Sequence, residues 1–388
     1  MRILLFTGKG GVGKTTLAAA TAAGLAQQGR KTLVVSTDPA HSLSDAVDQR
    51  LGTEPVEVAD GLYAVQVDSL GLLDEVWVEL REQVRHALAD AGVDSLDAAE
   101  LTVLPGVDEV LALGEVRRLA ASGPWDTVVV DCGPTAETLR LLALPEAISG
   151  YLRKLVVRQS RLAGRGRGGT TEAVRRLGAH LESLRELLTD PATTTVRLVL
   201  TPERVVAAET RRTLTSLALR GIRVDGLVVN RLMPAPGLWR GSAASWLRTR
   251  RRQQNEVLAE LAATGLDQRL IRPVEHRAVE PVGLAALVEI AGELYGADDP
   301  LAGCDTGVSP LLQVSEVDEG GYELRVAVPL DRESAVDLAR VDDDLAVTID
   351  GFRRLIALPE LLRPCQVTGA ESDARGLLVS LRRQEDGR

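Results

Sequence analysis

The sequence contains few of the residues that several common classes of protein need. Aromatic residues make up only 3% of its 388 residues, so a surface that stacks on nucleic-acid bases is not expected. Its three cysteines, Cys132, Cys304 and Cys365, are far apart and include no C-x-x-C pair, which argues against a zinc site or a redox motif. No apolar run is long enough to span a membrane, and the N-terminus reads as a strand and not as a signal peptide. We therefore expect a cytoplasmic protein.

Lysine is also scarce, although arginine is abundant. It occurs only at Lys9, Lys14, Lys31 and Lys154, and two of these fall within one glycine-rich stretch near the N-terminus. Lysine retained in an arginine-rich chain indicates positions that need a compact ammonium group. The formal net charge of −10 argues against general binding of nucleic acid. The length suits two domains, and the apolar fraction of 45% is typical of a globular protein.

The glycine-rich stretch lies between an apolar run that predicts a buried strand, residues 2–6, and an alanine- and leucine-rich run that predicts a helix, residues 17–28. It reads GKGGVGKTT over residues 8–16, which fits the G-x-x-x-x-G-K-[ST] pattern of a phosphate-binding loop. Glycines let backbone N–H groups approach phosphate oxygens, and the helix start adds unpaired donors. The flanking strand and helix make an accidental match a poor alternative. The predicted nucleotide-binding residues are Gly8, Gly10, Gly11, Val12, Gly13, Lys14, Thr15 and Thr16.

Three side chains of this loop have predicted roles in binding ATP and Mg²⁺. Lys14 is expected on the β- and γ-phosphates, the Thr15 hydroxyl on Mg²⁺, and the Thr16 hydroxyl on the α-phosphate. A second magnesium ligand is predicted at Asp131, which ends the apolar strand of residues 125–131 at the same edge of the sheet as Thr15. We expect Asp131 to bind the metal through water.

Another carboxylate, Asp38, follows the predicted strand of residues 32–36 and precedes a proline. Ligands bind at the carboxyl ends of strands in doubly wound sheets, so Asp38 can orient or deprotonate the attacking water. Its spacing also fits the start of a helix, where it would only cap the backbone. Spacing alone leaves both possibilities open.

These motifs together resemble the ATPase family that includes the arsenite-pump ATPase ArsA and the ATPases that target tail-anchored proteins. The extra lysine in GKGGVGKT is typical of the deviant phosphate-binding loop of this group, and DPAHSLSD at residues 38–45 resembles its switch I. Residues 131–142 resemble its switch II, except that Ala136 stands where the family usually has glycine. The resemblance covers roughly residues 1–295. It implies a homodimer that closes on ATP, with Lys9 reaching the partner's nucleotide and Asp38 supporting hydrolysis.

The same resemblance implies residues near the adenine base. Asn230, in the stretch VVNRL, resembles the residue that reads the adenine edge in this family. The alternative is a polar residue that closes a turn at the end of the predicted strand 224–229. Pro273 follows the last predicted strand of the sheet, in the segment that the family places close to adenine.

The rest of the chain divides into helical and strand-rich parts. The sequence pattern predicts mostly helix over residues 70–121 and 146–190, and in the targeting ATPases, which the chain resembles, such helices form an apolar groove for a transmembrane client. Residues 158–171 are basic and glycine-rich, which indicates a solvated loop or, alternatively, a site for an acidic partner or lipid headgroups. Residues 296–309 are predicted to be a linker. Residues 310–388 alternate with a period of two and resemble the α-crystallin domain of small heat-shock proteins.

The sequence thus predicts an α/β fold, with a doubly wound, mostly parallel P-loop sheet and helical insertions, followed by a small antiparallel β-sandwich. The preferred hypothesis is a homodimeric Mg-ATP-dependent ATPase whose switches couple hydrolysis to binding or targeting of a hydrophobic client protein, with a membrane partner also possible. The alternative is the ATPase subunit of an arsenite efflux pump, which would need clustered cysteines. The switch sequences argue against a third possibility, a positioning ATPase of the ParA/MinD type.

Overall fold

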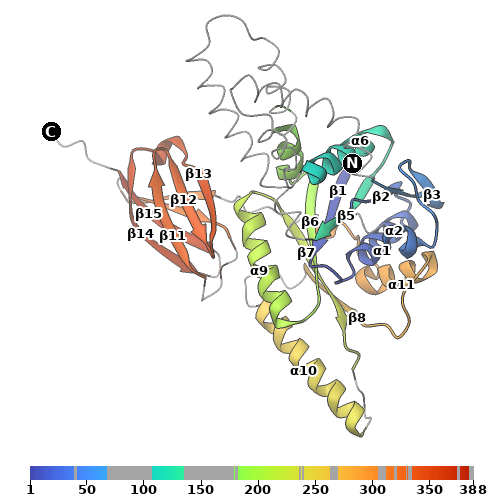
Figure 1. The fold of residues 1–388 in the computed structure, drawn as a ribbon. Helices are drawn as coiled ribbons and strands as arrows, with labels where there is room; N and C mark the ends of the chain where they lie inside the picture. The colour runs from blue at the N-terminus through green and yellow to red at the C-terminus, as the bar shows by residue number, and fades with distance from the viewer. Residues whose placement is uncertain are drawn as a thin grey trace, which may run out of the picture. The chain divides into compact units, whose positions relative to one another are not determined.

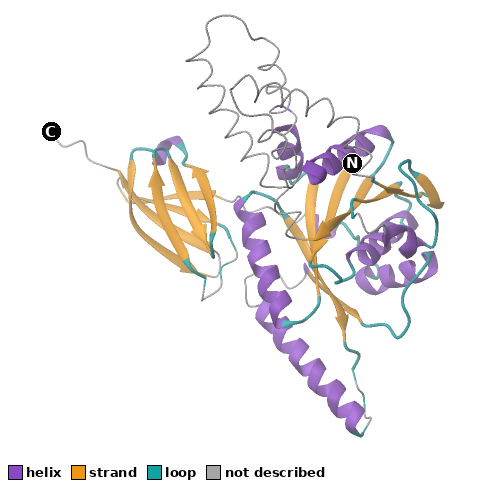
Figure 2. Cartoon of the chain, viewed as in Figure 1, coloured by secondary structure: helices purple, strands orange, loops and turns teal. Residues whose placement is uncertain are grey.

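The computed structural model contains a large sheet with helices and two smaller C-terminal sheets (Figures 1 and 2). The residues that it describes are 1–38, 42–67, 107–134, 179, 182–235, 237, 240–262, 270–304, 312–318, 321–328, 330, 334–373 and 376–383. The chain divides into two compact units, which are Met1–Arg197 with Val279–Pro300, and Leu198–Ala278 with Leu301–Arg388.

The large sheet has eight strands, and most of the pairings that define it are parallel. In order across the sheet, they are β3 (Val56–Ala59), β4 (Leu62–Gln66), β2 (Thr32–Ser36), β5 (Thr127–Pro134), β1 (Arg2–Gly8), β6 (Thr194–Leu200), β7 (Val224–Leu232) and β8 (Ile271–Glu275). Strand β5 pairs in parallel with both β1 and β2, and β7 pairs in parallel with β8, whereas β3 is antiparallel to β4. This order confirms the predicted doubly wound α/β sheet.

The centre of the first unit is formed by strands whose side chains are buried on both faces, as expected for a parallel sheet between helices. Helix α1 (Lys14–Gln27) packs on β1, β2 and β5, and also on α2 (Ser42–Val47) and α11 (Leu284–Tyr295) (Figure 1). A Cβ atom on Gly24 of α1 would lie 2.9 Å from Ala291 Cβ, so glycine permits this close approach. The C-terminal helix α11 therefore completes the unit in which the N-terminal loop lies.

A buried polar chain reinforces this junction. The hydroxyl groups of Thr21 and Tyr295 lie 2.7 Å apart, and Arg197 Nη1 donates to the Tyr295 hydroxyl at 2.8 Å. Arg197 Nη2 also donates to the carbonyl oxygen of Pro300 at 2.9 Å. Because buried polar groups need such partners, these contacts help to fix α11 against α1 and β6.

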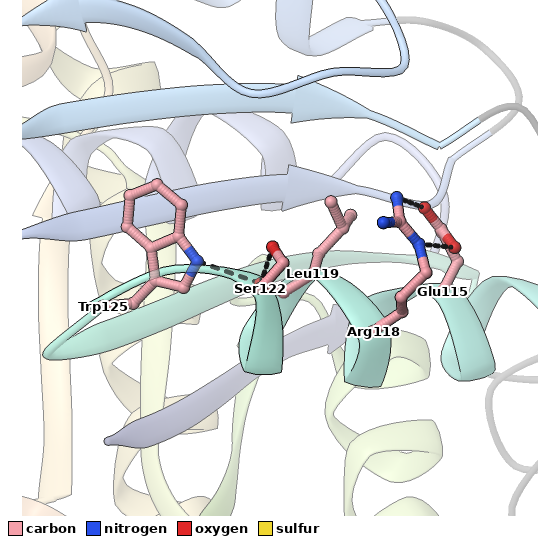
Figure 3. Close-up of polar contacts among 5 residues, drawn as sticks. All are labelled: Glu115, Arg118, Leu119, Ser122 and Trp125. Atoms are coloured by element: carbon pink, nitrogen blue, oxygen red, sulfur yellow. Dashed lines mark hydrogen bonds and ion pairs between the residues drawn. The ribbon is translucent and has the colours of Figure 1, made fainter.

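The start of β5 is fixed by the turn that follows α6 (Val107–Ser122) (Figure 3). Trp125 Nε1 and Ser122 Oγ both donate to the carbonyl oxygen of Leu119, at 2.9 and 2.8 Å, which satisfies an acceptor at the helix end. Nearby, Arg118 Nη2 and Glu115 Oε1 form an ion pair at 2.6 Å. The Arg118 side chain is exposed, so solvent screens the pair and it contributes little to stability. The turn matters for function because β5 carries Asp131; the strand continues beyond this residue to Pro134, whereas the sequence predicted that it ends at residue 131.

The second unit contains α9 (Arg204–Leu219), α10 (Ser242–Ala262) and the C-terminal strands. One antiparallel sheet has the order β14 (Cys365–Asp373), β15 (Gly376–Arg383), β10 (Gly321–Val326) and β9 (Leu312–Asp318), and the other has the order β11 (Val336–Val341), β12 (Asp344–Ile349) and β13 (Phe352–Ala357). Leu324, Val347 and Val379 belong to the buried cluster that the two sheets share. This arrangement confirms the predicted antiparallel sandwich.

Several sequence-based expectations lie outside the described residues. They are His41, most of the predicted helical regions, Ala136 and the rest of switch II beyond Pro134, and the basic stretch 158–171. Within the predicted linker, residues Ala302–Cys304 form a short 3-10 helix, η3, and Cys304 Sγ donates to Asp225 Oδ2 at 3.1 Å. The domain boundaries at 295 and 310 stay a prediction. Among the helices that the structure describes, none is both long and apolar enough to cross a membrane.

Candidate active site

The phosphate-binding loop joins the end of β1, Gly8, to the first residue of α1, Lys14. Gly11 and Gly13 have φ angles of 78° and 93°, in the left-handed region that side-chain-bearing residues rarely adopt. Gly13 caps α1, and the first turn of this helix contains no acidic residue. The open helix terminus and its N–H donors are therefore suited to an anion.

The two loop lysines have different environments. Lys14 is buried, and its Nζ donates to the carbonyl oxygen of Lys9 at 3.4 Å. The Lys9 side chain is exposed, whereas Val12 is buried beneath the loop and Thr16 is half-buried on the first helical turn. The loop thus keeps one ammonium group inside its own turn and presents another at the surface.

Thr15 and Asp131 come together, although 116 residues separate them in the sequence. The Thr15 hydroxyl donates to Asp131 Oδ2 at 2.7 Å. Asp131 lies on β5 opposite Phe6 of β1 and opposite Ser36 of β2, so the parallel register brings all three strand ends to one edge of the sheet. This is the edge at which doubly wound sheets bind their ligands.

Two serines that the sequence analysis did not single out complete this cluster. Ser36, at the end of β2, donates to Asp131 Oδ2 at 3.2 Å and accepts the backbone N–H of Asp38 at 3.3 Å. The hydroxyl of Ser42, at the start of α2, lies 2.9 Å from the Thr15 hydroxyl. The available signal was that Ser36 lies two residues before Asp38 and that Ser42 lies within the DPAHSLSD motif. The backbone N–H of Asp38 therefore connects this residue to the cluster.

Asp131 is completely buried, and burial raises the pKa of its carboxyl to about 6. The hydrogen bond from Thr15, the charge of Lys14 and the hydrogen bond from Ser36 lower the pKa, and the nearby carboxylate of Asp38 raises it. The second carboxylate oxygen, Oδ1, is buried and has no hydrogen-bond partner among the described residues. The Thr15 hydroxyl and the Asp131 carboxylate, with its unsatisfied oxygen, are ligands that fit Mg²⁺. The ion usually fills its remaining coordination positions with waters and phosphate oxygens.

This raised pKa predicts a pH-dependent stability of the nucleotide- and metal-free protein. The usual carboxyl pKa is 3.8, so between pH 4 and 6 the folded state holds the proton more often than the unfolded state, and rising pH destabilises the fold. Asp131→Asn removes this cost, which is about 3 kcal/mol at pH 7.5 and about half of that at pH 5. We expect the unfolding temperature of the variant, relative to wild type, to be higher at pH 7.5 than at pH 5, because the cost of burying the amide in place of Oδ1 is the same at both pH values.

Thermal unfolding at the two pH values, with a chelator present, measures this difference. Asp60→Asn, at an exposed position, serves as the control and should show no comparable pH-dependent gain. A gain for Asp131→Asn that is equal at both pH values would contradict the assigned origin of the effect.

Asn230 and Pro273 lie on neighbouring strands of the second unit. Val229 of β7 pairs with Pro273 of β8, and the register shifts immediately afterwards. Asn230 Oδ1 accepts the backbone N–H of Arg231 at 2.9 Å, and Arg231 has a φ of 59°. Asn230 therefore lies at a local irregularity within β7, which continues to Leu232, and not in a turn at the end of the strand as the alternative supposed. Its predicted contact with adenine, and that of Pro273, stay predictions.

The three cysteines are buried free thiols. Burial, together with the charge of Asp131, raises the pKa of Cys132 to about 12, and burial also raises the pKa of Cys365. Cys304 contacts Asp225, as described above. In the part of the chain that the structure describes, no group of three or more histidine, cysteine or acidic side chains is arranged to hold a metal ion.

Comparison with known proteins agrees with this fold and loop. The family model of the ArsA anion-transporting ATPases matches residues 1–296, and the model of the HSP20-like domain found in ArsA matches residues 319–381. Protein Rv2184c of Mycobacterium tuberculosis is 40% identical, over 98% of this chain and 96% of its own. A putative arsenical pump-driving ATPase of Chlorobaculum tepidum is 35% identical, over 92% and 90% of the two chains. The ATPase GET3 of Podospora anserina is 32% identical, over 67% and 81%. The chain therefore belongs to the ArsA family of anion-transporting ATPases and is an ATP-hydrolysing enzyme.

Proposed function

We propose that this ATPase is a Mg-ATP-dependent homodimer that couples hydrolysis to conformational switching. The observation that carries the proposal is the contact between Thr15 and Asp131 beside the phosphate-binding loop, with a buried carboxylate oxygen left over. The loop supplies the anion site and this pair supplies the cation site, so the geometry suits a magnesium-bound nucleotide.

In this proposal each residue of the site has a distinct task. The loop amides and Lys14 bind the phosphates, with Thr16 on the α-phosphate, and Thr15 and Asp131 hold Mg²⁺. When bound, the cation would neutralise charge on the phosphate oxygens during phosphoryl transfer. Asp38 orients the attacking water, and Asn230 and Pro273 contact adenine.

The proposed dimer forms through the nucleotide face, with Lys9 acting on the nucleotide of the partner subunit. Its support is the exposure of Lys9 and an exposed apolar segment in the same unit. Val279, Val282 and Leu284 are 78%, 49% and 38% exposed, and the Gly283 N–H donates to the carbonyl oxygen of Ala46 in α2 at 2.9 Å. Exposed apolar side chains that cluster in this way are typical of protein interfaces. Helix α2 begins at Ser42, which contacts Thr15, so this apolar segment lies along the helix that borders the site.

We further propose that the switching serves the binding or targeting of an apolar client protein. The HSP20-like match of the sandwich and the likeness to GET3 ATPases support this view. A second candidate, the driving of arsenite efflux, is favoured by relatives named putative arsenical pump-driving ATPases. A soft metalloid binds thiolates, and the buried Cys132 and Cys365, with raised pKa values, are poorly suited to that role.

The ATPase rate with each candidate effector tests these two functions. A hydrophobic helical peptide should raise kcat several-fold, whereas a scrambled polar peptide of equal length should leave it unchanged. Arsenite should have no effect. Stimulation by arsenite that disappears when Cys132, Cys304 and Cys365 are all replaced by alanine would instead support the pump-driving role and contradict the client proposal.

A further inference from the structure

The hydroxyls of Ser36 and Ser42 lie on either side of switch I residues 37–41 and contact the two proposed magnesium ligands. Ser36, directly before the segment, donates to Asp131. Ser42, directly after it, contacts Thr15. The chain therefore leaves the cluster at one serine and returns to it at the other, only six residues later.

The direction of these hydrogen bonds follows from the number of protons that each group carries. Thr15 has one hydroxyl proton, and the short 2.7 Å contact gives this proton to Asp131 Oδ2, which can only accept when ionised. Ser42 must therefore donate to Thr15. On the other side, Ser36 gives its proton to Asp131 Oδ2 and accepts the N–H of Asp38. Both chains of donors end on the same carboxylate oxygen, which leaves Oδ1 as the unsatisfied oxygen.

We propose that Ser36 and Ser42 are positioning residues for ATP hydrolysis, a serine clasp that fixes the two ends of switch I to the two sides of the proposed cation site. The clasp rests on the proposed function, because it acts through Asp38, Thr15 and Asp131. Ser36 holds the backbone of Asp38, so it sets where that carboxylate can lie. Ser42 holds the start of α2 to the hydroxyl of Thr15.

A purely structural role for Ser36 would lead to a different result. Ser36 is completely buried, and a buried hydroxyl needs partners for stability alone. If that were its only task, its removal would lower stability without affecting turnover more than another buried hydroxyl on the same strand does. Thr32 provides this comparison, since it is equally buried at the opposite end of β2 and donates to the carbonyl oxygen of Arg30 at 3.1 Å.

Two measurements on the full-length protein test the clasp. The first is hydrogen exchange of the backbone amides of residues 37–42 without nucleotide, followed by mass spectrometry of peptides. Ser36→Ala should speed exchange of the Asp38 amide, and Ser42→Ala that of the residues up to the start of α2, each several-fold, because the hydroxyl that holds them is lost. The Thr37 N–H donates to the carbonyl oxygen of Asp131 at 2.9 Å and should stay protected in both variants. Thr32→Val should leave the exchange unchanged, and Ser42→Thr, which keeps the hydroxyl, should restore the wild-type rate. Ser42 is only half-buried, so its variants remain informative if Ser36→Ala folds poorly.

The second measurement is steady-state ATP hydrolysis. Each serine-to-alanine variant should lower kcat by about tenfold to a hundredfold, with KM for ATP changed by less than a few-fold, because a misplaced group affects turnover more than binding. Adding Ser36→Ala to Asp38→Asn should cost less than Ser36→Ala costs in the wild type, since the part of its effect that acts through Asp38 is already lost, whereas its hydrogen bond to Asp131 is not. Thr32→Val should behave as wild type.

Wild-type exchange in both serine variants would overturn the clasp, and so would equal losses of kcat for Ser36→Ala and Thr32→Val. These outcomes can be distinguished from a failure of the proposed function, which Asp38→Asn tests. If Asp38→Asn hydrolyses ATP at the wild-type rate, the role proposed for Asp38 is wrong, while faster exchange in the serine variants would still support a clasp that holds switch I.

Discussion

Replacing Lys9 with alanine should lower kcat for ATP hydrolysis by about a thousandfold, with a much smaller change in affinity for the nucleotide. A cation supplied in trans to the transferring phosphoryl group contributes about a thousandfold or more in other phosphoryl-transfer enzymes. The side chain of Lys9 is exposed, and the contact that its residue makes with Lys14 uses the backbone carbonyl, which the substitution preserves. Single-turnover hydrolysis and equilibrium binding of ATP separate the two effects.

Mixing two inactive variants tests whether Lys9 acts across the dimer. In a mixed dimer of Lys9→Ala and Asp38→Asn subunits, the Lys9→Ala subunit keeps its own Asp38 and receives Lys9 from the other subunit. One site of the two should therefore recover activity. Lys9→Arg keeps the charge but changes the shape, so it should recover only part of the rate. A mixture that forms mixed dimers with ATP but stays inactive would show that Lys9 does not act in trans.

Replacing Asp38 with asparagine should slow hydrolysis by about a hundredfold to ten thousandfold, the usual range for loss of a group that handles the proton of the attacking water. Because the ATP-bound state then persists, the variant should accumulate as an ATP-dependent dimer. The backbone contact with Ser36 is retained, so the segment should keep its place. Light scattering coupled to gel filtration, with ATP and Mg²⁺, measures the change in mass, and adding Lys9→Ala should abolish the dimer.

Asp45→Asn is the matched control, since Asp45 belongs to the same DPAHSLSD motif but is exposed on α2. It should hydrolyse ATP like wild type and show no trapped dimer. If Asp38→Asn gives the same result as Asp45→Asn, Asp38 has only a structural role, as the helix-capping alternative proposed.

The strands that bring the site together could be predicted because they are buried on both faces. The central residues of β1, β2 and β5 are continuous apolar runs, and each run ends in a turn or a polar residue that marks the carboxyl edge of the sheet. The P-loop spacing then indicates the phosphate site, and the carboxylate after the run at 127–130 indicates the cation site. Local sequence was sufficient here because local pattern and tertiary environment agree.

Prediction failed where exposure hides the strand pattern. The alternation described for residues 310–388 does not extend through β14, along which only Cys365 is buried, and no strand was predicted for β3, which is short and partly exposed. In β11, the alternation of Val336 and Leu338 is interrupted by Arg340 on the same side of the strand, opposite the buried Leu345 of β12. Such edge strands are specified by pairing with a neighbour and not by their own hydrophobic pattern.

The two serines of the clasp were missed for a different reason. A serine at a strand end is a common turn residue, and nothing in its immediate sequence reveals which distant group it will face. Only the register of β2 with β5 places Ser36 opposite Asp131, and only the return of the chain to α2 places Ser42 at Thr15. These contacts depend on tertiary structure, so spacing along the chain could not identify them.

The packing of α1 against α11 has a consequence for synthesis on the ribosome. The helix that follows the phosphate-binding loop is made first, but its partner Ala291, and Tyr295 that contacts Thr21, are made more than 250 residues later. At the usual rate of translation this delay is on the order of tens of seconds. Throughout that time the apolar side of α1 lacks its final cover, so the nascent ATPase domain should bind chaperones and become protease-resistant only after residue 295 has left the exit tunnel.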